Sequence, residues 1–322
     1  MRTKILTAVI VSSFTIHHSS FGQGVLTPPG APAPTMKSLA QIEARTPISS
    51  APFTITNPGS YYLTANLSVS SGNAITIATN CVTLDLNGFS IFSTAASATG
   101  TAILLNGTLR NITIANGFIQ GGVTNNGSGV YSGGGFANGI YYSGNPPVNV
   151  LVSRVSVSGC LDDGIVLASG DSTVVESCTV RTVGSYGIWA STVTQSSAID
   201  CGNSAIQGDQ VSDCRGQTSG LANGVFAFTA LNCYGSSSSF VGVWTTTALN
   251  CYGTSSSGYG VEAYTALNCY GSSSSSDGFY VNGSAIGCYG SSSSGRGIVT
   301  TIANSCYSTT GDAGIGSKYN MP

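Results

Sequence analysis

The segment Thr229-Ala230-Leu231-Asn232-Cys233-Tyr234-Gly235 recurs almost unchanged as Thr247–Gly253 and Thr265–Gly271. Each copy is followed by a serine-rich stretch, and two looser copies span 284–290 and 302–308. The cysteines of the five copies are 18, 18, 19 and 18 residues apart. Self-similarity at a short fixed period is typical of a solenoid, in which each unit buries its apolar face against its neighbours.

A second marker, a glycine followed by an apolar residue, falls between these cysteines and extends the repeat backwards to Gly139-Ile140. Before that point, runs such as Ala74–Ile77 and Val82–Leu86 alternate apolar with polar or small residues, as half-buried strands do. We therefore expect an all-β chain, a single-stranded right-handed parallel β-helix of about ten coils over residues 51–316. The C-terminal coils are expected to be the same coil with about five residues deleted from one side.

The two ends of the chain differ from the repeat. Residues 1–22 combine a basic start, an apolar run and small residues near Gly22, which predicts a signal peptide and a secreted or cell-surface protein. Proline-rich residues 23–35 are expected to be a flexible lead, 36–50 an N-terminal cap with a short helix, and 317–322 a C-terminal tail. No segment is long and apolar enough to predict a membrane span.

Charge excludes several classes of function. Removal of the signal peptide takes away Arg2 and Lys4, so 10 basic residues become 8 against 12 acidic ones, and the formal charge moves from -2 to -4. Such a chain has no basic stripe for nucleic acid. The two histidines, His17 and His18, leave with the same segment. Histidine-dependent triads, general bases and metal sites are therefore excluded from the expected mature protein.

Charged residues make up only 7% of the chain, but hydrophobic residues make up 41%, which argues against disorder. Half of the charges expected in the mature protein lie in one stretch. They are Arg154, Asp162, Asp163, Asp171, Glu176, Arg181, Asp200, Asp209, Asp213 and Arg215. Any polar centre is expected there.

Four aspartates in this stretch are the candidate catalytic residues. Asp200 and Asp213 each precede a cysteine, so equal register would bring their carboxyl groups to about 5 Å, the separation of a retaining glycosidase pair. The alternative is that both are solvated positions in a column that Asn232, Asn250 and Asn268 continue. The adjacent pair Asp162-Asp163 supplies the other two candidates.

A column of tyrosines is the candidate ligand-binding site. One tyrosine follows the cysteine of each C-terminal coil, so an inward cysteine implies an outward tyrosine. An aromatic strip of this kind can bind the apolar faces of sugar rings, although a stack that only shields the sheet is the alternative. The column consists of Tyr234, Tyr252, Tyr270, Tyr289 and Tyr307.

The ten cysteines are expected to be mostly inward thiols rather than disulfides, because most of them recur once per coil. No Cys-x-x-Cys motif occurs, and the serine-rich turns lack the carboxylates of calcium-binding repeats. We expect no metal and no cofactor.

The segments Met36–Ile48, Pro58–Leu63 and Val82–Gly88 resemble the N-terminal coils of the pectin-lyase-like right-handed parallel β-helix proteins, many of them secreted. That resemblance implies the fold but not one activity, because the fold carries polysaccharide lyases, hydrolases, epimerases and adhesins. Galacturonan hydrolases of the family use Asn-Thr-Asp, Asp-Asp, Gly-His-Gly and Arg-Ile-Lys segments. Only Asp162-Asp163 matches one of them.

Three functions remain open at the level of sequence. The first is a non-catalytic β-helix that binds a polysaccharide or another cell-surface partner through the tyrosine column or the charged stretch. The second is a polysaccharide-degrading enzyme, a glycoside hydrolase or lyase, that works with carboxylates alone. The third is a purely structural surface repeat.

Overall fold

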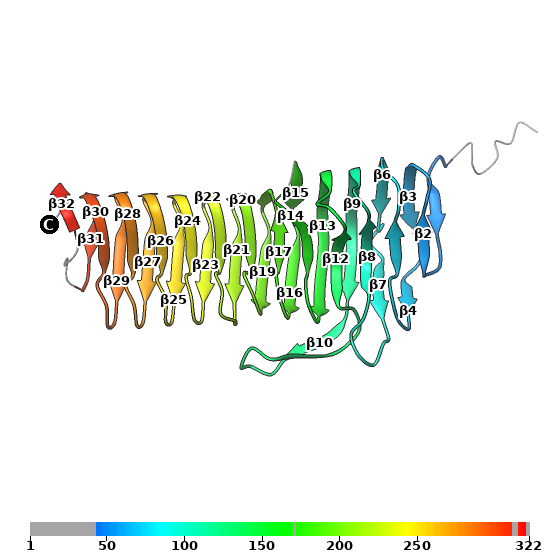
Figure 1. Cartoon of the computed structure of the whole chain (residues 1–322), viewed down its shortest axis with the longest axis horizontal. Helices are drawn as coiled ribbons and strands as arrows, with labels where there is room; N and C mark the ends of the chain where they lie inside the picture. The colour runs from blue at the N-terminus through cyan, green and yellow to red at the C-terminus, as the bar shows by residue number, and fades with distance from the viewer. Residues whose placement is uncertain (1–42, 170–171, 311–314, 320–322) are drawn as a thin grey trace, which may run out of the picture. The chain divides into compact units, whose positions relative to one another are not determined.

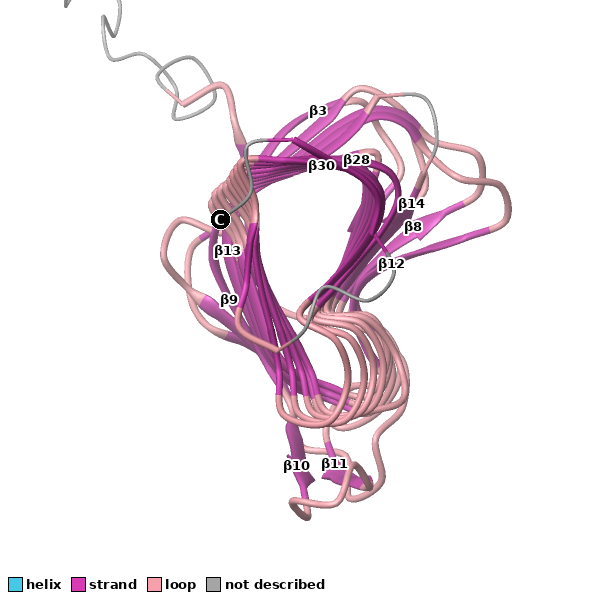
Figure 2. Cartoon of the chain, turned by 90° about the vertical axis from the view of Figure 1, so that its left-hand side faces the viewer, coloured by secondary structure: helices cyan, strands magenta, loops and turns pink. Residues whose placement is uncertain are grey.

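The computed structural model describes residues 43–169, 172–310 and 315–319. From Ala44 onward these residues form one parallel β-solenoid, whose coils follow one another from β2 at one end to β32 at the other (Figure 1). No helix occurs among the described residues. Viewed along its length, the solenoid has a closed cross-section built from three faces of parallel strands, here called A, B and C (Figure 2).

Face B is the longest column of paired strands and has fourteen levels. Its separate strands are β1 (Thr46–Ile48), β3 (Gly59–Leu63), β6 (Val82–Asp85), β15 (Thr173–Glu176), β18 (Thr192–Thr194) and β32 (Ile315–Tyr319). Two further levels are the first parts of β9 (Arg110–Gln120) and β13 (Val148–Cys160). The other six are the last parts of β20 (Ile206–Ser212), β22 (Val225–Leu231), β24 (Val243–Leu249), β26 (Val261–Leu267), β28 (Phe279–Ile286) and β30 (Ile298–Asn304).

Face A precedes face B in each coil. Its separate strands are β2 (Phe53–Ile55), β5 (Ile75–Ile77), β8 (Thr101–Asn106), β12 (Asn138–Ser143), β14 (Ile165–Ala168) and β17 (Ile188–Ala190). In the later coils one strand runs through faces A and B, and these strands are β20 (Ile206–Ser212), β22 (Val225–Leu231), β24 (Val243–Leu249), β26 (Val261–Leu267), β28 (Phe279–Ile286) and β30 (Ile298–Asn304).

Face C follows face B and includes the last parts of β9 and β13. Its other strands are β4 (Leu67–Val69), β7 (Ser90–Ser93), β16 (Thr179–Val183), β19 (Ser197–Cys201), β21 (Arg215–Thr218), β23 (Tyr234–Ser237), β25 (Tyr252–Ser255), β27 (Tyr270–Ser273), β29 (Tyr289–Ser292) and β31 (Tyr307–Ser308). One antiparallel hairpin, β10 (Gly122–Asn125) and β11 (Tyr131–Gly134), projects from a corner of the cross-section (Figure 2).

The structure corrects two of the predictions about the N-terminal part. The solenoid has fourteen levels rather than about ten, because the early coils lack the glycine and cysteine markers and vary in length. The step is 38 residues from Ile112 to Val150 but 18 from Val174 to Thr192. The predicted helical cap is also wrong for the described residues, since Thr46–Ile48 is the first strand of face B and pairs with β3. Residues 36–42 of that cap lie outside the described residues, as do 1–35.

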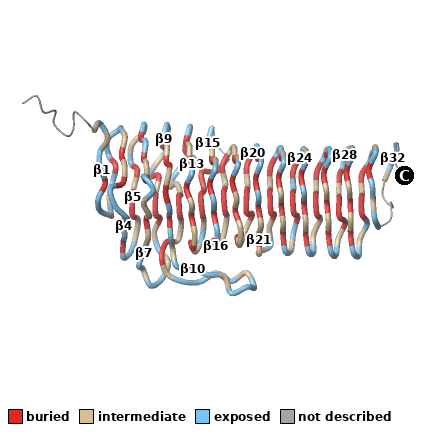
Figure 3. The backbone as a smooth tube through the Cα atoms, turned by 180° about the vertical axis from the view of Figure 1, so that it is seen from behind, coloured by how far each residue is buried: buried red, intermediate tan, exposed pale blue. Residues whose placement is uncertain are grey.

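Buried and more exposed positions alternate along most strands, so that buried positions form continuous bands along the solenoid (Figure 3). The interior contains isoleucine and leucine in the early coils, such as Leu63 and Ile114, and smaller residues in the later ones. The central prediction is confirmed, because Ala230, Ala248 and Ala266 pair in register and Cys233, Cys251 and Cys269 form one buried column beside them.

The cysteines fall into two inward columns rather than one. Seven of them, Cys178, Cys214, Cys233, Cys251, Cys269, Cys288 and Cys306, lie at the corner between faces B and C. Cys160 and Cys201 lie at the far end of face C. All ten cysteines are free thiols, and only Cys81 is exposed. Burial raises the pKa of the Cys178 thiol to about 11, so this thiol fills the interior as an apolar group and is not a nucleophile.

An asparagine column forms the corner just before those cysteines. Asn232, Asn250 and Asn268 have φ values of 53°, 52° and 53°, in the left-handed region that asparagine tolerates better than most residues. The Asn250 side-chain amide donates to Oδ1 of Asn232 at 3.2 Å, so the column is also hydrogen-bonded along the axis.

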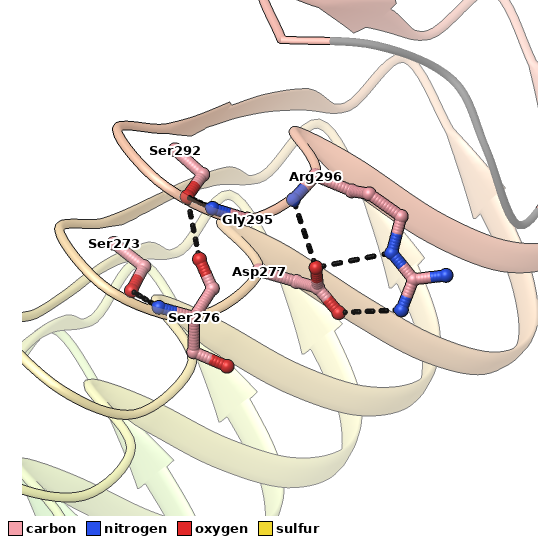
Figure 4. Close-up of polar contacts among 6 residues, drawn as sticks. All are labelled: Ser273, Ser276, Asp277, Ser292, Gly295 and Arg296. Carbon is pink, nitrogen blue, oxygen red and sulfur yellow. Dashed lines mark hydrogen bonds and ion pairs between the residues drawn. The ribbon is translucent and has the colours of Figure 1, made fainter.

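The serine-rich turns after face C are ordered by an inner serine. In β27 the Ser273 hydroxyl donates to the Gly258 carbonyl of the preceding coil at 2.7 Å. The same hydroxyl accepts from the Ser276 N–H at 2.9 Å (Figure 4). One coil later, Ser292 accepts from the Gly295 N–H at 2.8 Å. The serine repeats therefore fix the turn where the chain leaves face C.

Replacing this inner serine is expected to destabilise the protein. Ser273→Ala removes a buried hydroxyl and both of its part-buried hydrogen bonds, which costs about 1–3 kcal/mol of unfolding free energy. Urea denaturation measures the loss, with the exposed Ser275→Ala in the same turn as the control, expected within about 0.5 kcal/mol of wild type. Equal effects of the two variants would contradict this role of Ser273.

Candidate functional site

The predicted carboxylate pair does not form, because Asp200 and Asp213 lie at opposite ends of face C. Asp213 (φ 55°) occupies the corner column between faces B and C, where it accepts a hydrogen bond from Nδ2 of Asn232 at 2.9 Å. Asp200 lies at the end of β19, where the adjacent Cys201 pairs with Thr218 and not with Cys214. The prediction was wrong because two cysteine columns were treated as one. The alternative, a corner position that the asparagines continue, holds for Asp213.

Asp200 attaches the β10–β11 hairpin to face C. Its carboxylate accepts hydrogen bonds from Asn125 Nδ2 at 2.6 Å and the Tyr131 hydroxyl at 3.1 Å, both in the hairpin. It also accepts from Thr182 at 2.9 Å and Ser219 at 3.1 Å on the neighbouring coils. Burial would raise the pKa of Asp200, but these four hydrogen bonds outweigh it and lower the pKa. Such a carboxylate is a structural anchor, with its acceptor sites in use.

We expect this anchor to make stability depend on pH. Because the folded-state pKa of Asp200 is depressed, its contribution is present above the unfolded pKa of about 3.9 and is lost as the pH falls through the folded value. Asp200→Ala should therefore lower the melting temperature near neutral pH and converge with wild type in acid. Melting curves recorded from neutral to acid pH measure the gap, with the exposed Asp162→Ala as the control. A gap independent of pH would contradict the assignment.

Asp162 and Asp163 lie in the turn between β13 and β14. Asp162 is exposed, and Asp163 accepts a hydrogen bond from the Tyr186 N–H at 3.0 Å on the next coil. Burial raises the pKa of Asp163, while hydrogen bonds from Ser185 and Tyr186 act in the opposite direction. Neither residue has a hydrogen bond to Asp200 or Asp213 among the described residues.

The charged stretch is also distributed around the solenoid. Arg154 lies at the corner between faces B and C, Glu176 on face B, Arg181 on face C and Asp209 at the junction of faces A and B. Asp171 lies outside the described residues. No cluster of three or more cysteine or carboxylate side chains suited to a metal ion occurs in the part of the chain that the structure describes. Proximity in sequence therefore did not become proximity in space.

The tyrosine column is aligned as predicted, on the outer surface of face C. Successive ring centroids from Tyr234 to Tyr307 are 5.3, 4.5, 4.9 and 5.4 Å apart, with interplanar angles of 6–23°. The Arg215 guanidinium lies over the Tyr234 ring at 5.3 Å and extends the stack by one coil.

This stacking changes what the tyrosines can bind. Each inner ring covers the faces of its neighbours, and the outer face of Tyr234 is covered by Arg215. The surface therefore presents ring edges and hydroxyl groups, whereas sugars dock on ring faces. Ligand binding by Tyr234, Tyr252, Tyr270, Tyr289 and Tyr307 stays a prediction, and the stacking favours the shielding alternative.

A groove that the sequence analysis missed lies over the junction of faces A and B. It has a volume of about 380 Å³ and spans the coils of β20 to β28. Its floor is made by small buried residues, Gly208, Ala227, Thr245 and Ala263. The residues on either side of each floor residue point outward and form the two walls, with Gln207, Phe226, Trp244 and Glu262 on face A and Asp209, Phe228, Thr246, Tyr264 and Asn282 at the junction.

The groove begins where the coil becomes shorter. β14 and β15 are separated by a loop, and Ser169 of that loop lines one end of the groove. From β20 onward a single strand crosses the junction without a loop. The Thr245 hydroxyl supports this crossing, since it lies 2.9 Å from the carbonyl oxygen of Phe228 and 3.1 Å from that of Thr247. The later coils thus cross from face A to face B without a loop, which leaves this surface uncovered.

Aromatic side chains dominate the walls of the groove. Phe226 and Trp244 stack at 4.7 Å on the face A side. Phe228 and Tyr264 are 67% and 61% exposed on the opposite side, although both are large apolar side chains. Exposed aromatic rings around a depression of this volume are typical of a ligand-binding surface. The signal in the sequence was the repeated triplet of two large residues around a small one, as in Phe226-Ala227-Phe228 and Glu262-Ala263-Tyr264.

Comparison with known proteins does not show a family for this chain. No family model and no curated protein matches the chain, so the predicted resemblance to pectin-lyase-like proteins is not confirmed. One solved structure, the enzymatically active domain of tailspike protein 2 of bacteriophage CBA120, aligns at 14% sequence identity and a TM-score of 0.32. The alignment covers 76% of this chain and 42% of that one, so the chain spans less than half the length of the tailspike domain. Within the described residues, no helix has the length and apolar character to cross a membrane.

Proposed function

We propose that this protein is a glycan-binding β-solenoid that holds an oligosaccharide along the groove at the junction of faces A and B. The observation that carries the proposal is the pair of aromatic walls, with the exposed Phe228 and Tyr264 on one side and the stacked Phe226 and Trp244 on the other. Rings of this kind offer apolar faces to sugars, and Gln207, Thr246 and Asn282 supply hydrogen-bonding groups between them.

The carboxylates of the groove favour binding over hydrolysis. Asp209 and Glu262 belong to coils three levels apart, which separates their backbones by roughly 14 Å along the axis. Glycoside hydrolases hold their two carboxyl groups within about 5–9.5 Å of each other. Residues 19–322 also contain no histidine. The same proposal includes export of the protein, directed by residues 1–22. It also includes a right-handed coil, because nearly all parallel crossovers have this hand.

Removing one aromatic wall should weaken glycan binding. Trp244→Ala is expected to reduce affinity for neutral oligosaccharides about ten-fold, because it removes an exposed ring and the stacking partner of Phe226. Titration calorimetry with cellohexaose and the hexamer of N-acetylglucosamine measures the loss. Tyr252→Ala in the tyrosine column is the matched control and should bind like wild type. Loss with Tyr252→Ala but not with Trp244→Ala would move the site to face C.

A further inference from the structure

The charged residues of the groove all carry the same sign. Asp209 and Glu262 line it, and no lysine or arginine is among the lining residues. Arg181 and Arg215 lie on face C, and Arg296 forms an ion pair with Asp277 at 3.0 Å in a serine-rich turn (Figure 4). A polyanionic chain such as a uronate polymer would therefore meet only like charge in the groove, which selects against it.

Glu262 is placed to receive a cation. It follows Trp244 and precedes Tyr280 in the outward column of face A, so it is the next residue along that column after the stacked rings of Phe226 and Trp244. It is half-buried and has no hydrogen-bond or ion-pair partner among the described residues. Burial raises its pKa, as expected for a carboxylate without a compensating charge. The phenols of Tyr259, Tyr264 and Tyr280 lie near it.

We propose that the groove selects amino sugars, with the protonated amine of a hexosamine chain held between the Glu262 carboxylate and the Trp244 ring. This inference rests on the proposed glycan-binding function and names its substrate class. The carboxylate supplies the ion pair, and the indole face supplies a cation–π contact of the kind that ammonium groups make with tryptophan. Asp209 offers a second acceptor three coils away, which matches a ligand with a charge on several of its sugars.

The experiment compares hexamers of glucosamine, N-acetylglucosamine and galacturonate by titration calorimetry at about pH 6, where the amines of the first carry charge. Wild type is expected to bind the glucosamine hexamer about ten-fold more tightly than the acetylated one and to show no heat with galacturonate. The preference should shrink as salt is added. Glu262→Gln should lose the preference and bind both amino-sugar hexamers equally, and Glu176→Gln on face B is the matched control.

The outcomes separate this inference from the proposed function. Suppose that the acetylated hexamer binds and that Trp244→Ala weakens this binding, so that the proposed function holds. The amino-sugar inference then fails by itself if wild type shows no preference for free amines, or if Glu262→Gln keeps that preference. If none of the oligomers binds, the proposed function fails with it. Melting temperatures of Glu262→Gln and wild type should agree, since the side chain has no protein partner to lose.

Discussion

The parallel hydrogen bonding of each coil to the next, in register, is the constraint on which the rest of the structure depends. Thr229, Thr247 and Thr265 pair as equivalents, and so do Tyr234, Tyr252 and Tyr270. A side chain repeated in the sequence therefore becomes a column in space, with a rise of about 4.8 Å per coil. The columns are stabilised by ring stacking and by hydrogen bonds between equivalent residues, so they need few charged side chains.

Each column of equivalent residues has a different structural role. Asparagine holds the left-handed corner, cysteine and alanine fill a narrowing interior, and an inner serine such as Ser273 fixes the turn. The tyrosines stack so completely that little of their ring faces is left for a ligand. Ligand binding is favoured where the outward residues of successive coils differ. At the junction of faces A and B the outward residues change from coil to coil, and that variety gives the groove its mixture of rings, amides and carboxylates.

Much of the fold could be predicted from the sequence, but most of the candidate site could not. The register of Cys233, Cys251 and Cys269 follows from their spacing alone, whereas Cys201 and Cys214, 13 residues apart, belong to different columns. Asp200 and Asp213, which each precede one of these cysteines, therefore lie at opposite ends of face C. The hairpin that Asp200 anchors is inserted within a coil, so the repeat pattern does not predict where the hairpin lies. The groove was missed because the large residues of its repeated triplet differ from coil to coil, so only the folded chain brings Phe226 and Tyr264 together.

The most direct test of stacking in register is the thermal unfolding of two deletion variants, followed by far-ultraviolet circular dichroism. Removing residues 247–264 excises one full coil and joins Thr246 to Thr265, the equivalent of Thr247. Removing only 256–264 takes out half a coil and shifts every later column. The account predicts cooperative unfolding within a few degrees of the full chain for the first variant and loss of the cooperative transition for the second. Equal damage from both deletions would contradict it.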